Sequence, residues 1–162
     1  MLQRIGHLDR LAELAKVFDL SVVEEVFDEL TRPRNGKHAE LAKAAQLALA
    51  AVSKVSLDVG SVAAAALPKL LGQPREISRQ DAVSMAWILY EGTSHTFVTR
   101  DALCAYRALE ELQGRRVLGV FAFLREAVEA GALTRMAVQQ IAEAAVSTNG
   151  VRERLPSWWT TW

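Results

Sequence analysis

The chain has 162 residues, 51% of them hydrophobic, and its 19 Lys and Arg side chains balance 19 Asp and Glu side chains. This length suffices for one domain with a buried core, and a net charge of zero excludes a global basic field, so any nucleic-acid site must be local. The single cysteine, Cys104, excludes an intramolecular disulfide and a zinc site built from several cysteines. The start lacks the apolar core of a signal peptide, and the longest weakly charged run contains Lys54, Asp58 and Pro68. We therefore expect a cytoplasmic protein without a membrane span.

The first half of the chain predicts helices that alternate with short strands. Apolar residues at helical spacing indicate the helices, and compact runs of β-prone residues indicate the strands. The predicted elements are a helix over 8–15, a strand over 16–21, a helix from Ser21 to Leu30 opened by a capping box with Glu24, a loop at Pro33 and Asn35-Gly36, a helix over 39–53, a strand over 54–60, and an apolar helix followed by a loop over 61–76.

The second half alternates more regularly. Ser78 and Asp81 have cap spacing before an apolar helix that Gly92 closes. After it we expect a strand over 95–99, a helix over 101–113, a strand over 115–120, a helix over 121–130, a helix over 134–146 with Thr134 as its cap, and an irregular tail. Short strands joined through helices favour a parallel sheet with helices packed on it, and hence an α/β fold.

Three acidic residues form the candidate site. Asp101 directly follows the strand 95–99, and ligands of open parallel sheets bind beyond the carboxyl ends of the strands. Asp81 lies in the first turn of its helix, and Glu29 lies near the end of another helix, where a negative charge is locally unfavourable. Taken one at a time, each aspartate is better explained as part of a helix cap, whereas Glu29 is explained equally well as a solvated surface residue. Together, three carboxylates would bind Mg²⁺ or Mn²⁺, which can activate water for attack on a phosphodiester.

Five segments in the same order resemble the PIN-domain nucleases, in particular the predicted PIN-type proteins related to the VapC-like toxins of toxin–antitoxin pairs. They are "LQRIGHLDRLAEL" (2–14), "VFDLSVVEEVFDEL" (17–30), "ISRQDAVSMAWIL" (77–89), "FVTRDALCAYRA" (97–108) and "RRVLGVFAFLREAVEAGAL" (115–133), so the resemblance covers roughly residues 2–134.

The resemblance implies a PIN-like three-layer α/β/α domain over 1–150, with a short central parallel sheet, followed by a Trp-rich tail over 151–162. It also implies a metal-dependent endoribonuclease of toxin type, with Glu29, Asp81 and Asp101 as the catalytic residues that hold Mg²⁺ or Mn²⁺. Thr99 and Arg100 would contact the substrate. The implied partners are an RNA substrate, an antitoxin protein and a second copy of the chain in a homodimer.

One part of the family pattern has no counterpart here. The family begins with a strand that ends in an Asp, a central metal ligand, and this strand would lie at the centre of the sheet. Three explanations account for this difference: the start was assigned too late, the chain is truncated, or the protein is a degenerate family member. A partner or a second copy could supply the strand. Without the first Asp we expect weak or absent cleavage. A non-catalytic PIN-like module that binds RNA or protein is therefore the alternative, and a mostly helical interaction protein is a second one.

Other residues carry weaker expectations. Four arginines are candidates for phosphate contacts or for a solvated surface, and Cys104 is expected in the core rather than as a nucleophile. The tryptophans of the tail would either expose a patch for a partner or fold back over the core. The residues concerned are Arg100, Arg107, Arg115 and Arg116, and Trp158, Trp159 and Trp162. The three histidines show no ligand spacing.

Overall fold

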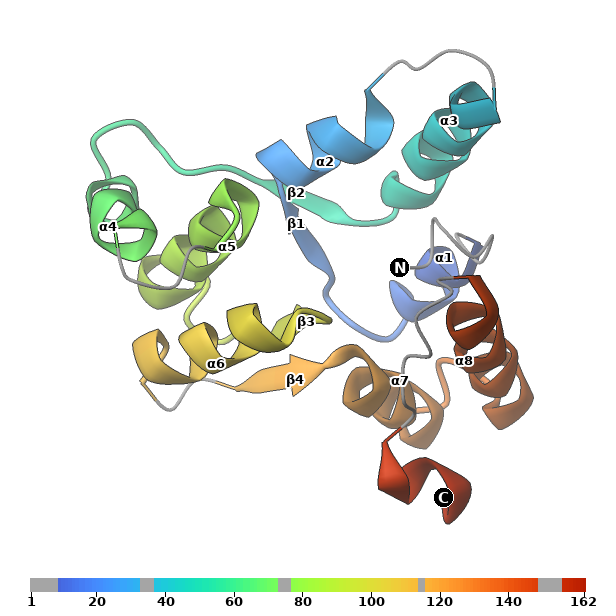
Figure 1. Cartoon of the computed structure of the whole chain (residues 1–162). Helices are drawn as coiled ribbons and strands as arrows, with labels where there is room; N and C mark the ends of the chain where they lie inside the picture. Colours follow the sequence, from blue (N-terminus) through green and yellow to red (C-terminus); the bar gives the residue numbers. More distant parts are fainter. Residues whose placement is uncertain (1–8, 33–36, 73–76, 114–115, 149–155) are drawn as a thin grey trace. The chain divides into compact units, whose positions relative to one another are not determined.

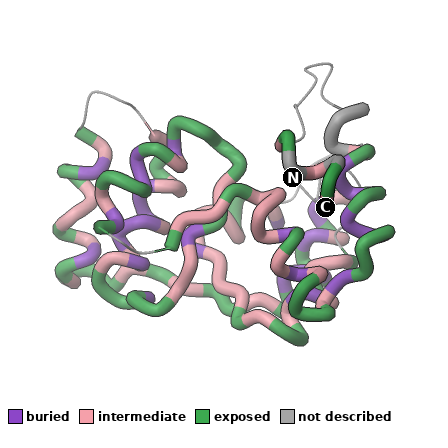
Figure 2. The backbone as a smooth tube through the Cα atoms, turned by 90° about the horizontal axis from the view of Figure 1, so that it is seen from below, coloured by how far each residue is buried: buried purple, intermediate pink, exposed green. Residues whose placement is uncertain are grey.

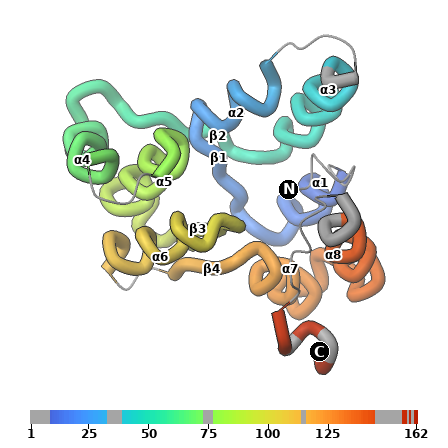
Figure 3. Tube along the Cα trace, viewed as in Figure 1, coloured from blue at the N-terminus to red at the C-terminus, as the bar shows by residue number. Residues whose placement is uncertain are grey.

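The structure of the chain is a computed structural model that describes residues 9–32, 37–72, 77–113, 116–148 and 156–162. The chain forms two compact units (Figure 1). Unit 1 comprises residues 1–20, 30–53 and 121–162, and unit 2 comprises residues 21–29 and 54–120. Figure 3 shows by colour that unit 1 combines early and late parts of the chain. The single domain over 1–150 stays a prediction.

The described residues form a mixed α/β structure that is mostly helical, which confirms the α/β class. In chain order the elements are α1 (Asp9–Leu14), β1 (Ser21–Val23), α2 (Glu24–Thr31), α3 (Lys37–Leu49), β2 (Ser53–Val55), α4 (Val62–Leu71), α5 (Arg79–Tyr90), β3 (Phe97–Thr99), α6 (Ala102–Glu111), β4 (Val117–Gly119), α7 (Val120–Glu129), α8 (Arg135–Thr148) and a 3-10 helix (Ser157–Thr160).

The strands form two separate two-stranded sheets within the described residues, β1 with β2 and β3 with β4. β3 and β4 are parallel, with Phe97 opposite Val117 and Thr99 opposite Gly119, which confirms the predicted parallel pairing. Parallel strands need a crossover between them, and α6 supplies it. Each sheet is short and narrow, so packing against helices must provide most of its stability.

Three helices enclose the core of unit 2. α5 supplies four buried residues, two of them alanines, and α4 packs closely along it. On α6 the buried side chains recur every three or four residues, as a helix with one inward face requires. Figure 2 shows the same change between buried and exposed positions along the helices. The buried members of this core are Ala63, Leu70, Ala82, Met85, Ala86, Ile88, Phe97, Cys104, Ala108 and Leu112.

Unit 1 has an alanine-rich core of its own. Ala45 and Ala48 of α3 are buried against Leu11 of α1 and Leu30. Alanine has no side chain beyond Cβ, which lets helices approach closely, and it is the strongest helix former. The alanine-rich run from residue 39, which predicted the helix, therefore also provides the surface by which α3 packs.

The predicted strand over 16–21 is wrong at its start. The backbone N–H groups of Val17 and Phe18 donate to the carbonyl oxygen of Leu14 at 3.1 and 2.9 Å, so they continue the turn of α1 and are not available to a sheet. The strand begins only at Ser21. The predicted capping box with Ser21 is also wrong, because Ser21 lies in β1 and α2 begins at Glu24.

The remaining helices lie where the sequence predicts them. Thr134 caps α8 as predicted, since its Oγ1 accepts from the Ala137 N–H at 3.1 Å. The predicted loop at Pro33 and Asn35-Gly36 lies outside the described residues.

The described end of the Trp-rich tail is ordered rather than irregular. The ring of Trp159 packs edge-on against Phe121 at a centroid distance of 5.5 Å and also contacts Trp162 at 5.4 Å. Arg135 lies over the Trp162 ring at 5.1 Å. Of the two alternatives for the tail, folding back is the one these two tryptophans adopt.

Candidate acidic site at the carboxyl end of β3

Asp101 is the N-cap residue of α6. It follows β3 by two residues, and its Oδ1 accepts from the Cys104 N–H at 3.0 Å. Its own N–H donates to Oγ1 of Thr99 at 3.2 Å, so the last residue of the strand fixes the turn into the helix. The capping role considered for Asp101 is thus confirmed. The cap hydrogen bond uses one of the two oxygens of an exposed carboxylate.

Asp81 is held in a similar way at the start of α5. The Ser78 Oγ caps this helix by accepting from the Asp81 N–H at 3.1 Å. The same hydroxyl donates to Oδ2 of Asp81 at 2.6 Å. Two hydrogen bonds between the same two residues fix the direction of the carboxylate, and the predicted cap is confirmed.

Both aspartates lie near enough to Cys104 to affect its thiol. This residue is buried, with 1% of its surface exposed. The pKa of the Cys104 thiol is raised to about 12, mainly by burial and next by the negative charge of Asp81; a hydrogen bond to Asp81 and the negative charge of Asp101 act in the same direction. A hydrogen bond with Thr99 has the opposite effect. Asp81, Thr99, Asp101 and Cys104 therefore form one group, which we call the acidic corner.

Glu29 is connected to the acidic corner through Gln80, the residue before Asp81. Oε2 of Glu29 accepts from Nε2 of Gln80 at 3.2 Å. This contact joins the carboxyl part of α2 to the first turn of α5 within unit 2. All three predicted acidic residues thus belong to unit 2, but among the described residues they are not placed as one group that could hold a metal ion.

The arrangement is looser than a closed metal site. Among the described residues, no group of three or more His, Cys, Asp and Glu side chains is placed to hold a metal ion. Two carboxylates from different helices nevertheless fit Mg²⁺ chemically, because this ion often binds through one or two carboxylates and keeps several waters. Oxygen donors of this kind fit Mn²⁺ as well.

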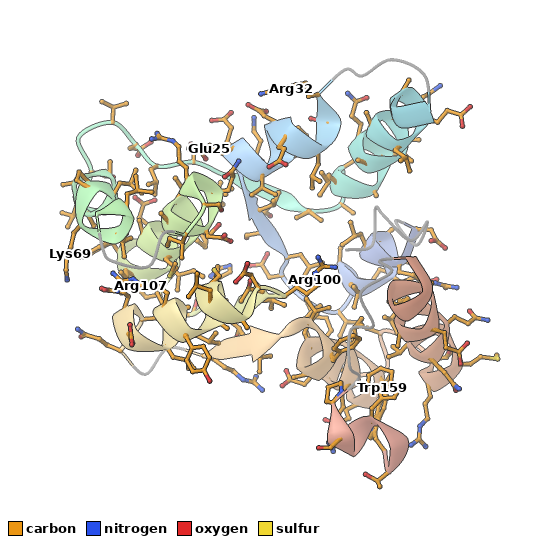
Figure 4. The ribbon with its side chains drawn as sticks, in the orientation of Figure 1. Glu25, Arg32, Lys69, Arg100, Arg107 and Trp159 are labelled. Atoms are coloured by element: carbon orange, nitrogen blue, oxygen red, sulfur yellow. The ribbon has the colours of Figure 1, made fainter. Side chains whose placement is uncertain are left out.

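The basic residues separate into different roles. Arg100 (Figure 4) is exposed between Thr99 and Asp101, and its contact with a substrate stays a prediction. Arg107 does not lie on the surface: its side chain is 7% exposed and pairs with Glu111, so the prediction of a phosphate contact or a solvated residue is wrong. Arg116 precedes β4, at the end of the sheet away from Thr99. Arg115 lies outside the described residues.

The raised pKa of Cys104 predicts a loss of stability in alkali. In the unfolded chain the thiol releases its proton near its ordinary pKa of 9.0, whereas in the folded chain it keeps the proton up to about pH 12. The unfolded state then binds fewer protons, so we expect the free energy of unfolding to fall as pH rises through this window. Urea unfolding at several pH values measures it.

Two variants test the cause of that fall. Cys104→Ala has no thiol to titrate, so its stability should depend less on pH between 9.0 and about 12. Asp81→Asn should lower the pKa of Cys104, measured by thiolate absorbance, because it removes a negative charge beside the thiol. An unchanged pKa in Asp81→Asn would contradict the contact between the two side chains.

Comparisons of the chain with protein-family models, with curated proteins and with solved structures found no match. The described helices are all too short or too polar to cross a membrane.

Proposed function

We propose that the chain is a PIN-like, metal-dependent endoribonuclease of toxin–antitoxin type. The observation that carries this proposal is the position of Asp101 beyond the carboxyl end of β3, with its carboxylate on the Cys104 N–H and Asp81 hydrogen-bonded to the Cys104 thiol. Glu29 supports it through its contact with Gln80. The proposal rests on these residues and on the resemblance of the five segments.

The proposed roles follow from the position of each side chain. Asp81 and Asp101 would hold Mg²⁺ or Mn²⁺, with Glu29 as the third carboxylate. The cation would activate water and offset the charge of the phosphodiester. Arg100, one residue from Asp101, would bind a phosphate and position the RNA, while Thr99 fixes the Asp101 backbone.

The proposed fold is the three-layer α/β/α arrangement with one central sheet. In such a fold a further strand would join the sheets β1–β2 and β3–β4, which are separate among the described residues. α5 packs against both β1 and β3, as a helix covering a single sheet would. An antitoxin protein and a homodimer remain part of this proposal.

We expect slow cleavage of a labelled RNA in the presence of Mn²⁺, reduced further in Asp101→Asn by about a hundredfold. Asparagine caps helices as well as aspartate does, so this variant keeps the cap of α6 and tests the charge alone. Glu143→Gln serves as the matched control, since it also removes one negative charge, from an exposed residue of unit 1. Equal cleavage by the native chain and Asp101→Asn would contradict the site.

The second candidate is a non-catalytic PIN-like module that binds RNA or a protein. The looseness of the acidic corner favours it, because the described side chains do not form a three-ligand cluster. A titration with Mn²⁺ separates the two candidates: absence of binding at about 1 mM would support the binding module.

A further inference from the structure

The outer side of α6 carries three large apolar residues in one row. Leu103, Tyr106 and Leu109 follow one another at intervals of three residues, and they are 41%, 63% and 60% exposed. Residues three apart on a helix are neighbours on its surface, so these residues form a continuous row, which we call the α6 ridge. No other element of the described residues carries more than one exposed large apolar residue. The α6 ridge is therefore a cluster, unlike the single apolar residues that are normal on a surface.

The inner side of the same helix is apolar as well. Cys104 and Ala108, with Leu112 at the helix end, are buried in the core of unit 2. A helix at a protein surface normally has polar residues opposite its buried face, whereas a helix that is apolar all round is covered all round. The sequence of α6 has apolar residues on both sides, although its outer side is exposed. This pattern indicates that another surface covers the α6 ridge.

The charges on α6 restrict what that surface can be. The charged residues of the helix are Arg107, which is buried, and the acidic Glu110 and Glu111. An anionic membrane or a nucleic-acid strand is bound by apolar or aromatic residues with basic residues beside them. The helix has no exposed basic residue, so neither of these fits. A protein surface with an apolar row of its own does.

A second copy of α6 offers such a row in matching order. Tyr106 lies three residues from each leucine, so two copies packed antiparallel about a two-fold axis at Tyr106 place each Leu103 opposite the partner's Leu109. Glu110, whose side chain is 62% exposed, then lies near the positively polarised start of the other helix. A parallel pair would instead bring the two Glu110 side chains together. The charges thus favour the antiparallel arrangement.

The size of the α6 ridge determines how strong such a dimer is. With these exposed fractions, the three residues present on the order of 300 Å² in each copy. Protein interfaces are roughly 57% apolar, so two ridges correspond to an interface of about 1,000 Å² in total. This area is at the lower limit for a specific interface. We therefore expect a reversible dimer with a Kd of about 10–100 µM.

We propose that two copies of the chain associate through the α6 ridge, with the two helices antiparallel. This inference rests on the homodimer that is part of the proposed function, and it assigns that dimer its surface. Asp101 precedes the buried Cys104 and Ala108 by three and seven residues, so it lies toward the inner side of the helix. The acidic corner is therefore not part of the dimer surface.

Sedimentation velocity of the full chain at about 5–500 µM tests the association. We expect the mass to rise from that of one chain to that of two. Leu109→Asp places a charge in the interface and should raise the Kd at least about thirtyfold, as the loss of a central contact does. Leu47→Asp is the matched control, because Leu47 is a 73% exposed leucine on α3, and its Kd should equal that of the native chain.

Two results of this experiment would overturn the proposal. A chain that stays monomeric over the whole concentration range would leave the α6 ridge to a different protein. A dimer that Leu109→Asp does not weaken would use another surface. Circular dichroism of each variant verifies that it is folded. Asp101→Asn should dimerise as the native chain does, so failure of the nuclease proposal would not affect these results.

Disulfide cross-linking tests the antiparallel arrangement. Tyr106→Cys should cross-link two copies, because the two-fold axis brings this position against itself. Leu103→Cys should not cross-link with itself, but it should cross-link with Leu109→Cys in an equal mixture of the two variants. Cys104 is 1% exposed and does not compete. Equal cross-linking of Leu103→Cys with itself and of Tyr106→Cys with itself would indicate parallel helices and overturn the proposal.

Discussion

A short apolar strand that ends in an aspartate, fused ahead of Met1, is expected to raise Mn²⁺-dependent RNA cleavage about a hundredfold. In the proposed PIN-like fold this strand pairs between β1 and β3 and brings a further carboxylate to Asp81 and Asp101. A single well-placed group that stabilises the charge developing in the transition state changes the reaction rate by about 10²–10³-fold. The measurement is cleavage of labelled RNA by the fused and the unfused chain under the same conditions.

The same fusion separates the structural effect of the strand from its chemical effect. A fused strand that ends in asparagine should raise the free energy of unfolding as the aspartate version does, because both join the two narrow sheets into a wider one. It should not raise cleavage, since it lacks the added charge. A proline in the middle of the strand should abolish both effects, because proline cannot donate to the sheet. Equal cleavage by the aspartate and asparagine versions would contradict the proposed role of the missing acid.

Local signals in the sequence identified the elements around the candidate site. Ser78 with Asp81, and Asp101 after a strand, are cap patterns that act within four residues, so the sequence contains all that determines them. The strand expected from Lys16 failed for the opposite reason. β-Prone residues there are used to complete a turn after α1, and Phe18 packs against Phe123, a residue far along the chain. Such a contact overrides local preference and is not visible in a short window.

The association of the acidic residues depended on long-range packing in the same way. Cys104 was predicted as a core residue, and its burial confirms this. Its contact with Asp81 joins helices α5 and α6, and no spacing rule predicts which residues of two helices face each other. Glu110 and Glu111 follow Arg107 by three and four residues, and this spacing indicates that they form ion pairs with Arg107 on the helix. The sequence did not show that this ion pair is buried.

Because the ion pair between Arg107 and Glu111 is buried, Glu111→Gln is the substitution with the largest expected loss of stability. We expect the free energy of unfolding to fall by about 3 kcal/mol. Nη2 of Arg107 lies 2.8 Å from Oε1 of Glu111, although the alignment is not that of a hydrogen bond and Nε of Arg107 has no hydrogen-bond partner. The attraction is therefore mainly ionic and depends on distance. Without the negative charge of Glu111, the guanidinium stays buried, and Glu110 at 3.7 Å compensates only in part.

A pair of the same length on the surface provides the control. Arg125 Nε and Glu129 Oε1 are also four residues apart and 2.8 Å from each other, but their side chains are 44% and 55% exposed. Glu129→Gln should therefore lower the free energy of unfolding by less than about 1 kcal/mol. Urea unfolding of both variants measures the contrast, and equal losses would contradict a dominant effect of burial.

The replacement of Arg107 itself shows where the loss in Glu111→Gln comes from. Arg107→Met removes the buried positive charge and keeps a long apolar side chain, so its expected loss is smaller than that of Glu111→Gln. In the double variant Arg107→Met with Glu111→Gln there is no buried charge left to compensate, and most of the stability lost in Glu111→Gln should return. If the two losses simply add, the pair is not coupled, and the stability of α6 comes from its apolar face alone. If stability returns, Arg107 is a buried charge that the fold tolerates only because Glu111 lies beside it.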